Sequence, residues 1–309
     1  MDPLRVERAV AEALEAGRPV VALESALITH GFSAPKNLSI AQRMEAAVRD
    51  QGVVPATAAV LDGQARIGLR DEEIARLASA DRRAGPPNGE SARKISLRDL
   101  PSALAQGASG GTTVAATIHL AHLAGIKVFA TGGIGGVHRG LPEDISADLT
   151  ALASVPITVV CSGAKAILDL PRTREALETR GIAVVGYGTD AFPGFYSRSS
   201  GLKADAVAHA PQEVARMARV RTALKIRAAL LVCVPVPEDD ELPPEEAETV
   251  IGRALDEAER MGVRGKDVTP FLLAQVVKLT DGRAQRANEA LLVNNARVAA
   301  LVAQAACRN

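Results

Sequence analysis

The chain has 309 residues, and its 36 lysines and arginines balance 36 aspartates and glutamates, so the formal net charge is zero. Nonspecific binding of nucleic acid depends on a basic surface and stacking of single-stranded bases depends on aromatic side chains, but this chain has five phenylalanines, two tyrosines and no tryptophan. The composition therefore argues against a nucleic-acid partner and favours an enzyme that acts on a small molecule.

Helical and strand patterns alternate in the first half of the chain. Amphipathic or apolar stretches predict helices at residues 5–16, 37–49, 71–77 and 112–123, with a further helix near residue 100. Short apolar runs predict strands at residues 19–24 and 54–61, and a short segment at 94–96 precedes the helix near residue 100. The most loop-like stretch, residues 81–91, is interpreted as an exposed excursion rather than a linker between domains.

The second half contains a clear series of buried strands. Runs rich in Val and Ile predict strands at residues 127–130, 157–161, 182–186 and 229–234, separated by helices at 145–153, 173–180 and beyond 211. Three helices close the chain, the last two at 270–279 and 285–306. Such alternation is typical of a parallel sheet covered on both faces. We predict an α/β fold with a mostly parallel central sheet in α/β/α layers, as a single domain over residues 1–309 with a helical C-terminus.

The cysteines and the hydropathy of the chain predict the cellular compartment of the protein. Cys161, Cys233 and Cys307 lie far apart, and no signal peptide is visible at the N-terminus, so we expect a reduced, cytoplasmic protein. The uncharged stretch at residues 100–126 is long enough to span a membrane, but it contains histidines, glycines and a proline. We expect it to form a loop and a buried helix, without any membrane partner.

Unusual residues follow the predicted strands. Glu24 ends the first strand, a glycine-rich run at residues 131–140 follows another, and Lys165 follows the next after a Ser-Gly-Ala turn. Because ligands of open α/β sheets bind at the carboxyl ends of the strands, these residues mark a candidate site. The glycine run is not a dinucleotide fingerprint, since His138 occupies the position of the third glycine.

Two loops are candidates for binding phosphate. The run at residues 131–140 allows close approach of backbone to an anion, and residues 109–113 (SGGTT) precede a helix whose free N–H groups and dipole favour one. Ordinary turn formation and N-capping would explain either loop alone. The two together, with His138 and Arg139 nearby, favour a phosphorylated ligand.

Asp144 and Asp148 are four residues apart, a spacing that places both carboxylates on one face of a helix. The simpler interpretation is a helix start, with Asp144 as the N-cap and Asp148 in solvent. Beside a phosphate-binding loop, however, the pair becomes a candidate site for Mg²⁺ or Mn²⁺, since hard cations prefer carboxylate and water oxygens.

Three further side-chain groups are candidates for chemistry. An ammonium in an apolar pocket loses hydration, so its pKa falls and the neutral amine can attack a carbonyl carbon. Lys165 is a candidate for this role. The alternative interpretation is that Lys165 forms an ion pair with an acid and has a structural role. Lys94 is either a phosphate contact or a surface residue. His119 and His122 lie three residues apart with no third ligand, which favours a core or surface pair over a metal site.

These stretches resemble the pseudouridine-5′-phosphate glycosidase family, in order and over almost the whole chain. The motifs that carry the resemblance lie at residues 22–25 (ALES), 29–31 (THG), 51–57 (QGVVPAT), 94–100 (KISLRDL), 111–115 (GTTVA), 125–140 (GIKVFATGGIGGVHRG), 144–148 (DISAD), 160–165 (VCSGAK), 269–273 (TPFLL) and 293–295 (VNN). The block at 125–140 is the most specific. Two departures are an excursion at 81–91 that is longer than in the family, and a shorter link between Gly140 and Asp144, which could change how Asp144 approaches a metal.

The resemblance implies reversible cleavage of the C–C glycosidic bond of pseudouridine 5′-phosphate to uracil and ribose 5-phosphate. It matches the family's Schiff-base lysine to Lys165, its proton-donating acid to Glu24 and a substrate-contacting lysine to Lys94. It also implies one Mn²⁺ per subunit on Asp144, with Mg²⁺ or another divalent ion as the alternative, and a homotrimer. The remaining substrate contacts fall on Val114, Ser146, Ala147 and Asp148, with Thr113, Thr131, His138 and Asn294 or its neighbour Asn295 as our further candidates.

Two other classes of protein share part of this pattern. A class I aldolase that acts on another sugar phosphate would also need a lysine at a strand end, but it would have no need for a metal site at Asp144 and Asp148. A noncatalytic phosphosugar-binding protein would keep the glycine loops and have no use for Lys165.

Overall fold

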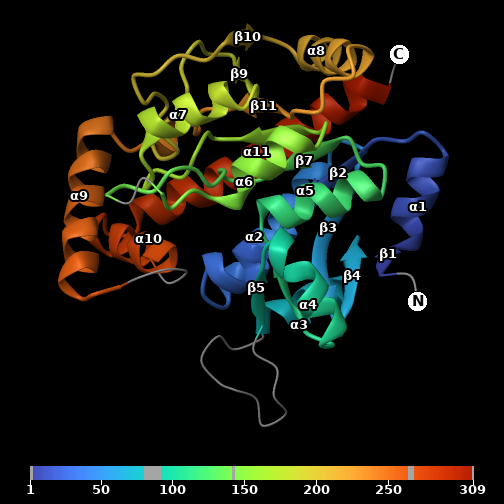
Figure 1. Ribbon diagram of the computed structural model, residues 1–309, viewed down its shortest axis with the longest axis horizontal. Helices are drawn as coiled ribbons and strands as arrows, with labels where there is room; N and C mark the ends of the chain where they lie inside the picture. Colours follow the sequence, from blue (N-terminus) through green and yellow to red (C-terminus); the bar gives the residue numbers. More distant parts are fainter. Residues whose placement is uncertain (1–2, 80–91, 141–142, 264–267, 308–309) are drawn as a thin grey trace.

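The structure is a computed structural model that describes residues 3–79, 92–140, 143–263 and 268–307. The described strands form one sheet of eleven (Figure 1). They are β1 Leu4–Val6, β2 Val20–Leu23, β3 Val54–Leu61, β4 Gln64–Ile67, β5 Arg93–Ile95, β6 Gly110–Thr112, β7 Val128–Ala130, β8 Thr158–Cys161, β9 Ala183–Tyr187, β10 Ala206–Ala208 and β11 Leu230–Cys233. The main path through the sheet is β1-β4-β3-β2-β7-β8-β11-β9-β10, and β6 joins β5 to β3.

The sheet is mostly parallel, as the sequence predicts. All pairings from β3 through β2, β7, β8, β11 and β9 to β10 are parallel. The antiparallel pairings among the described strands are those of β3 with β4 and with β6. Every residue of β2, β8 and β11 is buried, which requires cover on both faces and explains why these strands read as continuous apolar runs.

Helices cover both faces of this sheet. They are α1 Arg8–Glu15, α2 Lys36–Arg49, α3 Asp71–Ser79, α4 Leu100–Ala105, α5 Val114–Leu123, α6 Ala147–Ser154, α7 Leu170–Thr179, α8 Pro211–Ala223, α9 Pro244–Arg260, α10 Val268–Leu279 and α11 Arg283–Cys307, with shorter turns η1 Leu27–Gly31, η2 Leu97–Asp99 and η3 Glu238–Asp240. In Figure 1, α5 and α6 lie on one face of the strands, and α2 and α11 lie on the other. The predicted α/β class with helices on both faces and a helical C-terminus is therefore confirmed.

Helix α11 is the C-terminal element of the described core. By length and composition alone it is the one described helix that could cross a membrane, but 56% of its most apolar stretch is buried inside the protein. It packs against α2 and α8 and against β2, β7 and β8. Its apolar character is accounted for by this contact with the sheet.

Several short strands differ from the sequence prediction. The helix expected at 5–16 begins only at Arg8, because Leu4–Val6 pairs with β4. The expected Gly/Ser/Thr turn contains β6, so the following helix starts at Val114 rather than at residue 112. Strands β4 and β10 were not predicted. Strand β4 follows a turn at Asp62 and Gly63, whose φ angles of 52° and 73° are the left-handed geometry of a two-residue hairpin. The excursion at 81–91 and part of the link between Gly140 and Asp144 lie outside the described residues.

Candidate active site

Three neighbouring strands bring the predicted residues to one edge of the sheet. Strands β2, β7 and β8 are parallel neighbours, so their carboxyl ends coincide. Glu24 follows β2 and is 7% exposed, and Thr131 follows β7 and is fully buried. The Thr131 hydroxyl donates a hydrogen bond to the Glu24 carboxylate. Thr131, which we expected to contact substrate, therefore holds the side chain of the candidate acid.

Lys165 is positioned by the glycine-rich segment that follows β7. The Ile134 N–H donates to the Gly163 carbonyl at 3.0 Å, and the Lys165 N–H donates back to the Ile134 carbonyl at 3.0 Å. Gly163 has a φ of +80°, and a Cβ there would lie 2.7 Å from the Pro193 carbonyl oxygen. The turn after β8 therefore needs glycine for both its conformation and its packing, and this turn fixes where the Lys165 side chain begins.

The Asp148 carboxylate joins two segments of the site. It is 6% exposed, and its two oxygens accept hydrogen bonds from the N–H groups of Ala115 at 3.0 Å and Gly135 at 2.8 Å. The bond from Ala115 links Asp148 to the first turn of α5, and the bond from Gly135 links it to the glycine-rich segment. A Cβ at Gly135 would lie 2.6 Å from the Ser146 Cβ and 2.8 Å from an Asp148 oxygen. Glycine is therefore required where the backbone approaches the carboxylate.

The helical pairing expected for the two aspartates is wrong in its geometry. Helix α6 begins at Ala147 with Ser146 as its N-cap, and the Ser146 hydroxyl accepts a hydrogen bond from the Asp148 N–H at 3.2 Å. Asp144 thus precedes the helix and is not its N-cap, and Asp148 is buried rather than solvated. The exposed Ala147 begins the helix between them. Asp144 lies in the loop before α6 and Asp148 lies in the first turn of α6, so the two carboxylates do not share a helical face.

Asp144 lies at the solvent side of the site. Its side chain is 51% exposed, and one of its oxygens lies 3.9 Å from Nδ1 of His138, whose side chain is 21% exposed. No group of three or more His, Cys, Asp or Glu side chains gathers for a metal anywhere in the part of the chain that the structure describes. The donor set fits a Mg²⁺- or Mn²⁺-type ion that takes one protein carboxylate and completes its shell with water and ligand oxygens.

Two lysines and two carboxyl groups influence one another electrostatically in this site. Burial raises the pKa of Glu24, against the lowering effects of the Lys165 charge and the Thr131 hydrogen bond. Burial also lowers the pKa of Lys94, and the charge of Lys165 lowers it further while Glu24 and Asp148 oppose the change. A carboxyl group that keeps its proton to a higher pH, beside the Lys94 amine that loses its proton more readily, is suited to acid–base catalysis.

The N-terminus of α5 offers a place for an anion. Thr113 is its N-cap and the buried Val114 is its first residue. The Thr113 hydroxyl oxygen is buried and has no hydrogen-bond partner among the described residues. A buried hydroxyl without a partner is uncommon in a native protein, and at a helix N-terminus it is well placed to meet an anionic oxygen of a ligand.

A network of buried hydroxyl groups behind the site was not predicted from the sequence. The Ser25 hydroxyl donates to the Ala58 carbonyl and accepts from the Thr112 N–H at 3.0 Å, and the Thr112 hydroxyl donates to the same carbonyl at 2.8 Å. Ser25 adjoins Glu24, and Thr112 adjoins Thr113. The only sequence signal was the presence of hydroxyl residues beside the candidate residues in the motifs at 22–25 and 111–115.

Of the two adjacent asparagines, Asn295 reaches the strand ends. It is fully buried, and its amide donates to the Thr131 carbonyl at 2.9 Å and to the Ser162 hydroxyl at 3.1 Å. The Asn294 side chain instead accepts a hydrogen bond from exposed Arg297 at 3.0 Å. Asn295, and not Asn294, therefore hydrogen-bonds to the segments that carry Thr131 and Lys165.

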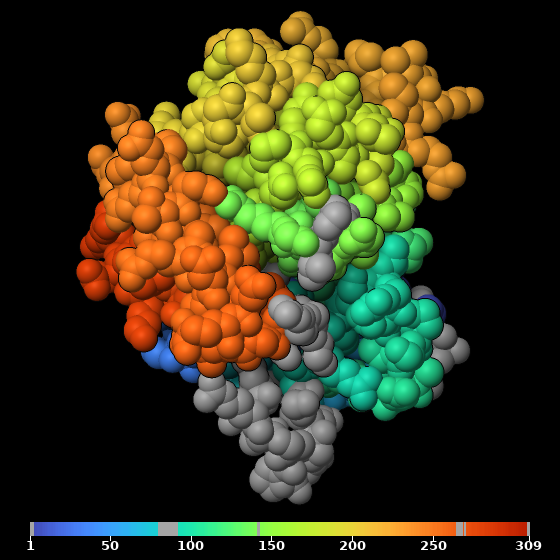
Figure 2. All heavy atoms as spheres, turned by 60° about the vertical axis from the view of Figure 1, so that its left-hand side comes forward, coloured from blue at the N-terminus to red at the C-terminus, as the bar shows by residue number. Residues whose placement is uncertain are grey.

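Helix α9 borders the glycine-rich segment. The Arg139 guanidinium donates to the Glu248 carboxylate, at 2.9 Å for one of the two bonds, and to the Leu168 carbonyl at 3.0 Å. Figure 2 shows the orange α9 segment beside the green segment that follows β7. Arg139, which we expected near a phosphate, thus serves to join α9 to the site's rim.

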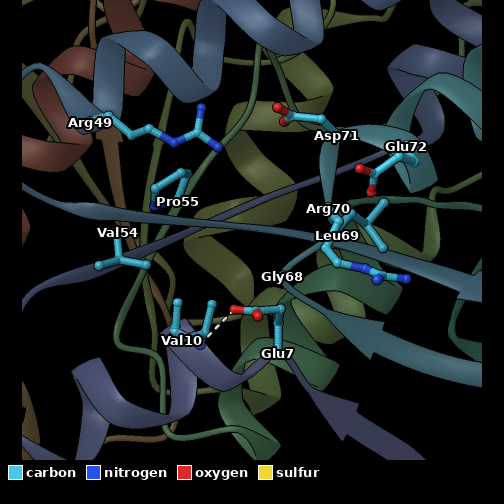
Figure 3. Close-up of a pocket in the computed structure, with 11 residues that line it drawn as sticks. Glu7, Val10, Arg49, Val54, Pro55, Gly68, Leu69, Arg70, Asp71 and Glu72 are labelled. Atoms are coloured by element: carbon cyan, nitrogen blue, oxygen red, sulfur yellow. Dashed lines mark hydrogen bonds between the residues drawn. The ribbon is translucent and has the colours of Figure 1, made fainter.

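A separate hollow lies on the part of the molecule near the amino end of β3. This cavity of about 390 Å³ is lined by Arg49, Val54, Gly68, Asp71 and neighbouring residues. Figure 3 shows Arg49 and Asp71 reaching toward one another from opposite walls, while Arg70 points away. The predicted catalytic residues do not line it. Its position at the other end of the strands separates it from the candidate active site.

Two cysteines lie at the strand ends that precede and neighbour the turn carrying Lys165. Cys161 and Cys233 end the adjacent parallel strands β8 and β11 in matched register, and both are fully buried free thiols. Burial and the neighbouring Cys161 raise the pKa of the Cys233 thiol. Because both thiols are buried, these two side chains serve as small apolar groups in the core.

Only the exposed Cys307 is expected to react with a thiol reagent in the folded protein. Titration with dithionitrobenzoate should show one fast thiol in native buffer and three in denaturant, since the chain has three cysteines. The Cys307→Ser variant provides the control and should show no fast thiol when folded. Fast reaction of Cys161 or Cys233 under native conditions would contradict the burial of the strand ends beneath Lys165.

Comparison with known proteins agrees with the resemblance predicted from the motifs. The family described as "Indigoidine synthase A like protein" matches residues 9–305. The protein named pseudouridine-5′-phosphate glycosidase from Solibacter usitatus is 52% identical to this chain, and the match covers 97% of this chain and 98% of that protein. The protein of the same name from Myxococcus xanthus is 48% identical, and the match covers 99% of both. The predicted family resemblance is thereby confirmed.

Solved structures share the fold over the full length. The prealnumycin C-glycosynthase AlnA in complex with ribulose 5-phosphate is 38% identical, with a TM-score of 0.89 and coverage of 99% of this chain and 98% of that one. An indigoidine synthase A-like protein from Thermotoga maritima is 34% identical, with a TM-score of 0.88 and coverage of 99% and 97%. The relatives therefore match the whole arrangement of strands and helices that positions the site.

Proposed function

Because the chain belongs to the indigoidine synthase A like family, we propose that it is a pseudouridine-5′-phosphate glycosidase, which reversibly cleaves the C–C glycosidic bond of its substrate to give uracil and ribose 5-phosphate. The observation that carries the proposal is the position of Glu24, Thr131 and Lys165 after the carboxyl ends of the three neighbouring parallel strands β2, β7 and β8. The names of the relatives at 48–52% identity support this reaction. The ribulose 5-phosphate complex of AlnA supports a five-carbon sugar phosphate as a ligand.

The proposed mechanism follows from the bond that breaks. A carbon leaving group has no nitrogen lone pair to ease its departure, so direct hydrolysis through an oxocarbenium ion is poor. In our proposal the Lys165 amine forms a bond to C1′ as the bond from C1′ to the ring oxygen breaks, and Glu24 donates a proton to that oxygen. The alkylated nitrogen loses a proton to the Glu24 carboxylate, and its lone pair then forms a double bond to C1′ as the bond from C1′ to C5 breaks. The electron pair of the broken bond takes up that proton at C5, and uracil leaves. Water hydrolyses the resulting iminium and releases ribose 5-phosphate.

The remaining residues bind and orient the substrate in this proposal. The N-terminus of α5, with Thr113 and Val114, receives the phosphate together with Lys94, whose ammonium is a phosphate ligand of the ordinary kind. Ser146, Ala147 and Asp148 border the sugar, and His138 lies on the solvent side. Asn295 acts through Thr131 and Ser162, so it is a positioning residue rather than a substrate contact.

We also propose that a divalent ion, Mn²⁺ or Mg²⁺, is held by Asp144 together with water and substrate oxygens. Such an ion supplies positive charge that offsets the charge of an anionic substrate. The exposure of Asp144 leaves room for water ligands. The residues that carry out bond making and breaking in the proposal are Lys165 and Glu24.

Treatment with a chelator is expected to remove most of the turnover, and Mn²⁺ is expected to restore it. The Asp144→Asn variant should need about tenfold or more Mn²⁺ for half-maximal turnover, since weakened ligation costs metal affinity on this scale. Asp190→Asn is a suitable control, because Asp190 is exposed and pairs with Lys203, which is exposed as well. Turnover that a chelator leaves unchanged would favour a metal-independent lysine enzyme such as a class I aldolase.

We further propose that the chain works as a single domain, assembles as a homotrimer and resides in the cytoplasm. One sheet and one continuous core of described residues support the first point, and three free cysteines support a reducing compartment. Light scattering on the purified protein tests the trimer, which should have three times the mass of the chain.

Synthesis from the products tests the proposed reaction. The protein is incubated with uracil, ribose 5-phosphate and Mn²⁺, and pseudouridine 5′-phosphate is sought by mass spectrometry and chromatography. Formation of this C-nucleotide by the native protein, and not by Lys165→Ala, is the expected result. Absence of product with every divalent ion would overturn the proposal, and binding of ribose 5-phosphate without turnover would indicate a phosphosugar-binding protein.

A further inference from the structure

A second hollow of about 420 Å³ lies at the edge of the sheet opposite the candidate active site. It is formed by the amino ends of β9, β10 and β11 and by the helix α8 that covers them, with Ala183, Ala206 and Leu230 at its base. Lys165 follows the carboxyl end of β8, so the sheet lies between the two places. We call this hollow the α8 groove. Its size is that of a small-molecule binding site.

The wall of the α8 groove is apolar and open to solvent. Val220, Leu224 and Ile226 line it and are 53%, 66% and 45% exposed. These are three of the six large apolar side chains that are clearly exposed in the described part of the chain. Scattered exposed apolar residues are ordinary, but a group of them around one cavity marks an interaction site.

A buried cation lies in the same groove. Arg221 is only 9% exposed, and its guanidinium donates to the carbonyls of Ile157 at 2.7 Å and Pro156 at 2.9 Å. Its Nε–H has no hydrogen-bond partner, and no carboxylate forms an ion pair with it, among the described residues. Burial lowers its pKa. A buried charge without a counterion is costly, and an anion in the groove would reduce that cost.

The other charged side chains of the α8 groove do not neutralise Arg221. Asp205 lines the groove, but its carboxylate is occupied by the Arg174 guanidinium and by the Val184 N–H at 2.8 Å. Arg216 is exposed and also lines the groove, so it adds a second positive charge. The groove therefore combines an apolar wall with an unmatched positive charge.

We propose that the α8 groove is a binding site for a small apolar carboxylate, such as a medium-chain fatty acid anion. The hydrocarbon chain lies against Met217, Val220 and Leu224, and the carboxylate accepts from the exposed Arg216 guanidinium and lies in the field of the unmatched Arg221 charge. The site is separate from the sugar-phosphate site and does not compete with it. Neither the relatives nor the proposed reaction assigns a ligand to this edge of the sheet.

Calorimetric titration with octanoate, with octanol as the neutral match, tests the proposal on the full-length protein. Saturable binding of one octanoate per chain is expected, at least about tenfold tighter than octanol, because a charged hydrogen bond within a binding site is worth about this much. Equal affinity for acid and alcohol, or no saturable binding of octanoate, would overturn the proposal.

Two matched variants locate the binding. Leu224→Glu places a negative charge on the exposed wall and should weaken octanoate binding by about tenfold or more. Met261→Glu makes the same kind of change at an apolar side chain that is 57% exposed and outside the α8 groove, and it should leave binding unchanged. Arg221→Met should remove the preference for acid over alcohol, and the Leu224→Glu result stands if this variant does not fold.

A competing occupant of the α8 groove is a second copy of the chain. In that case Leu224→Glu would lower the mass measured by light scattering, and the native protein would bind no octanoate. This outcome would overturn the carboxylate proposal and assign the α8 groove to an interface between subunits. Unchanged octanoate affinity in Leu224→Glu would equally overturn it.

Discussion

Replacing Lys165 with alanine is expected to abolish turnover, and the native protein is expected to form a covalent adduct at this residue. Borohydride added in the presence of ribose 5-phosphate reduces an iminium to a stable secondary amine, so the intact mass should increase by one reduced sugar phosphate per chain. The loss of rate in Lys165→Ala should be about 1,000-fold or more, since without the amine the carbon leaving group has no electron sink.

Lys94 supplies the matched control for the Lys165 experiment. It belongs to the same electrostatic cluster, but in our proposal its ammonium binds phosphate and forms no covalent bond. Lys94→Ala should therefore raise KM for the sugar phosphate while borohydride still labels Lys165 at saturating ligand. An adduct that persists in Lys165→Ala, or a native mass that stays unmodified, would contradict the Schiff base.

The inner strands could be predicted from the sequence because they are buried on both faces. Strands β2, β8 and β11 are buried at every position, and only a covered parallel sheet needs such continuous apolar runs. Strands β1 and β10, by contrast, have three residues each and lie at the two ends of the sheet. These two strands are only partly buried, so they lack the continuous apolar run that identifies the equally short but fully buried β7, and their pairing depends on a distant partner.

The edges of the candidate site were harder to predict than its centre. Glu24, Thr131 and Lys165 converge because parallel neighbours end at one edge, which follows from strand order. The role of Asp148 depends on hydrogen bonds to Ala115 and Gly135, and the choice of these partners is a matter of tertiary structure. A spacing of four residues suggested a shared helical face, but the helix begins after Asp144, and no local signal distinguishes the two cases.

The α11 asparagines, by contrast, can be distinguished by helical periodicity. Asn294 and Asn295 are identical in type and adjacent in sequence, and only the rotation of α11 against the sheet decides which of them meets Thr131. The periodicity of α11 does contain this information, because the neighbouring buried residues Leu291, Val298 and Val302 lie on the same helical face as Asn295.

The acid role of Glu24 gives the second large effect, and its sign follows from burial. Glu24 must hold a proton to donate one, and burial raises its pKa, so the protonated fraction persists to higher pH than for an exposed glutamate. The rate should therefore be high below this pKa and fall as the pH rises through it. Glu24→Gln should lower kcat by about 100-fold or more, the usual contribution of a general acid, and should remove this limb of the profile.

Thr131→Val separates the acid role from a merely structural one. The Thr131 hydroxyl donates to Glu24 and thereby lowers its pKa, so the near-isosteric valine should move the alkaline limb to higher pH while retaining a pH-dependent rate. A structural defect would lower the rate equally at every pH and leave the limb in place. A limb that persists unchanged in Glu24→Gln would assign the proton transfer to another group, and the buried carboxyl at the end of β2 would then serve only to balance the charges of Lys94 and Lys165.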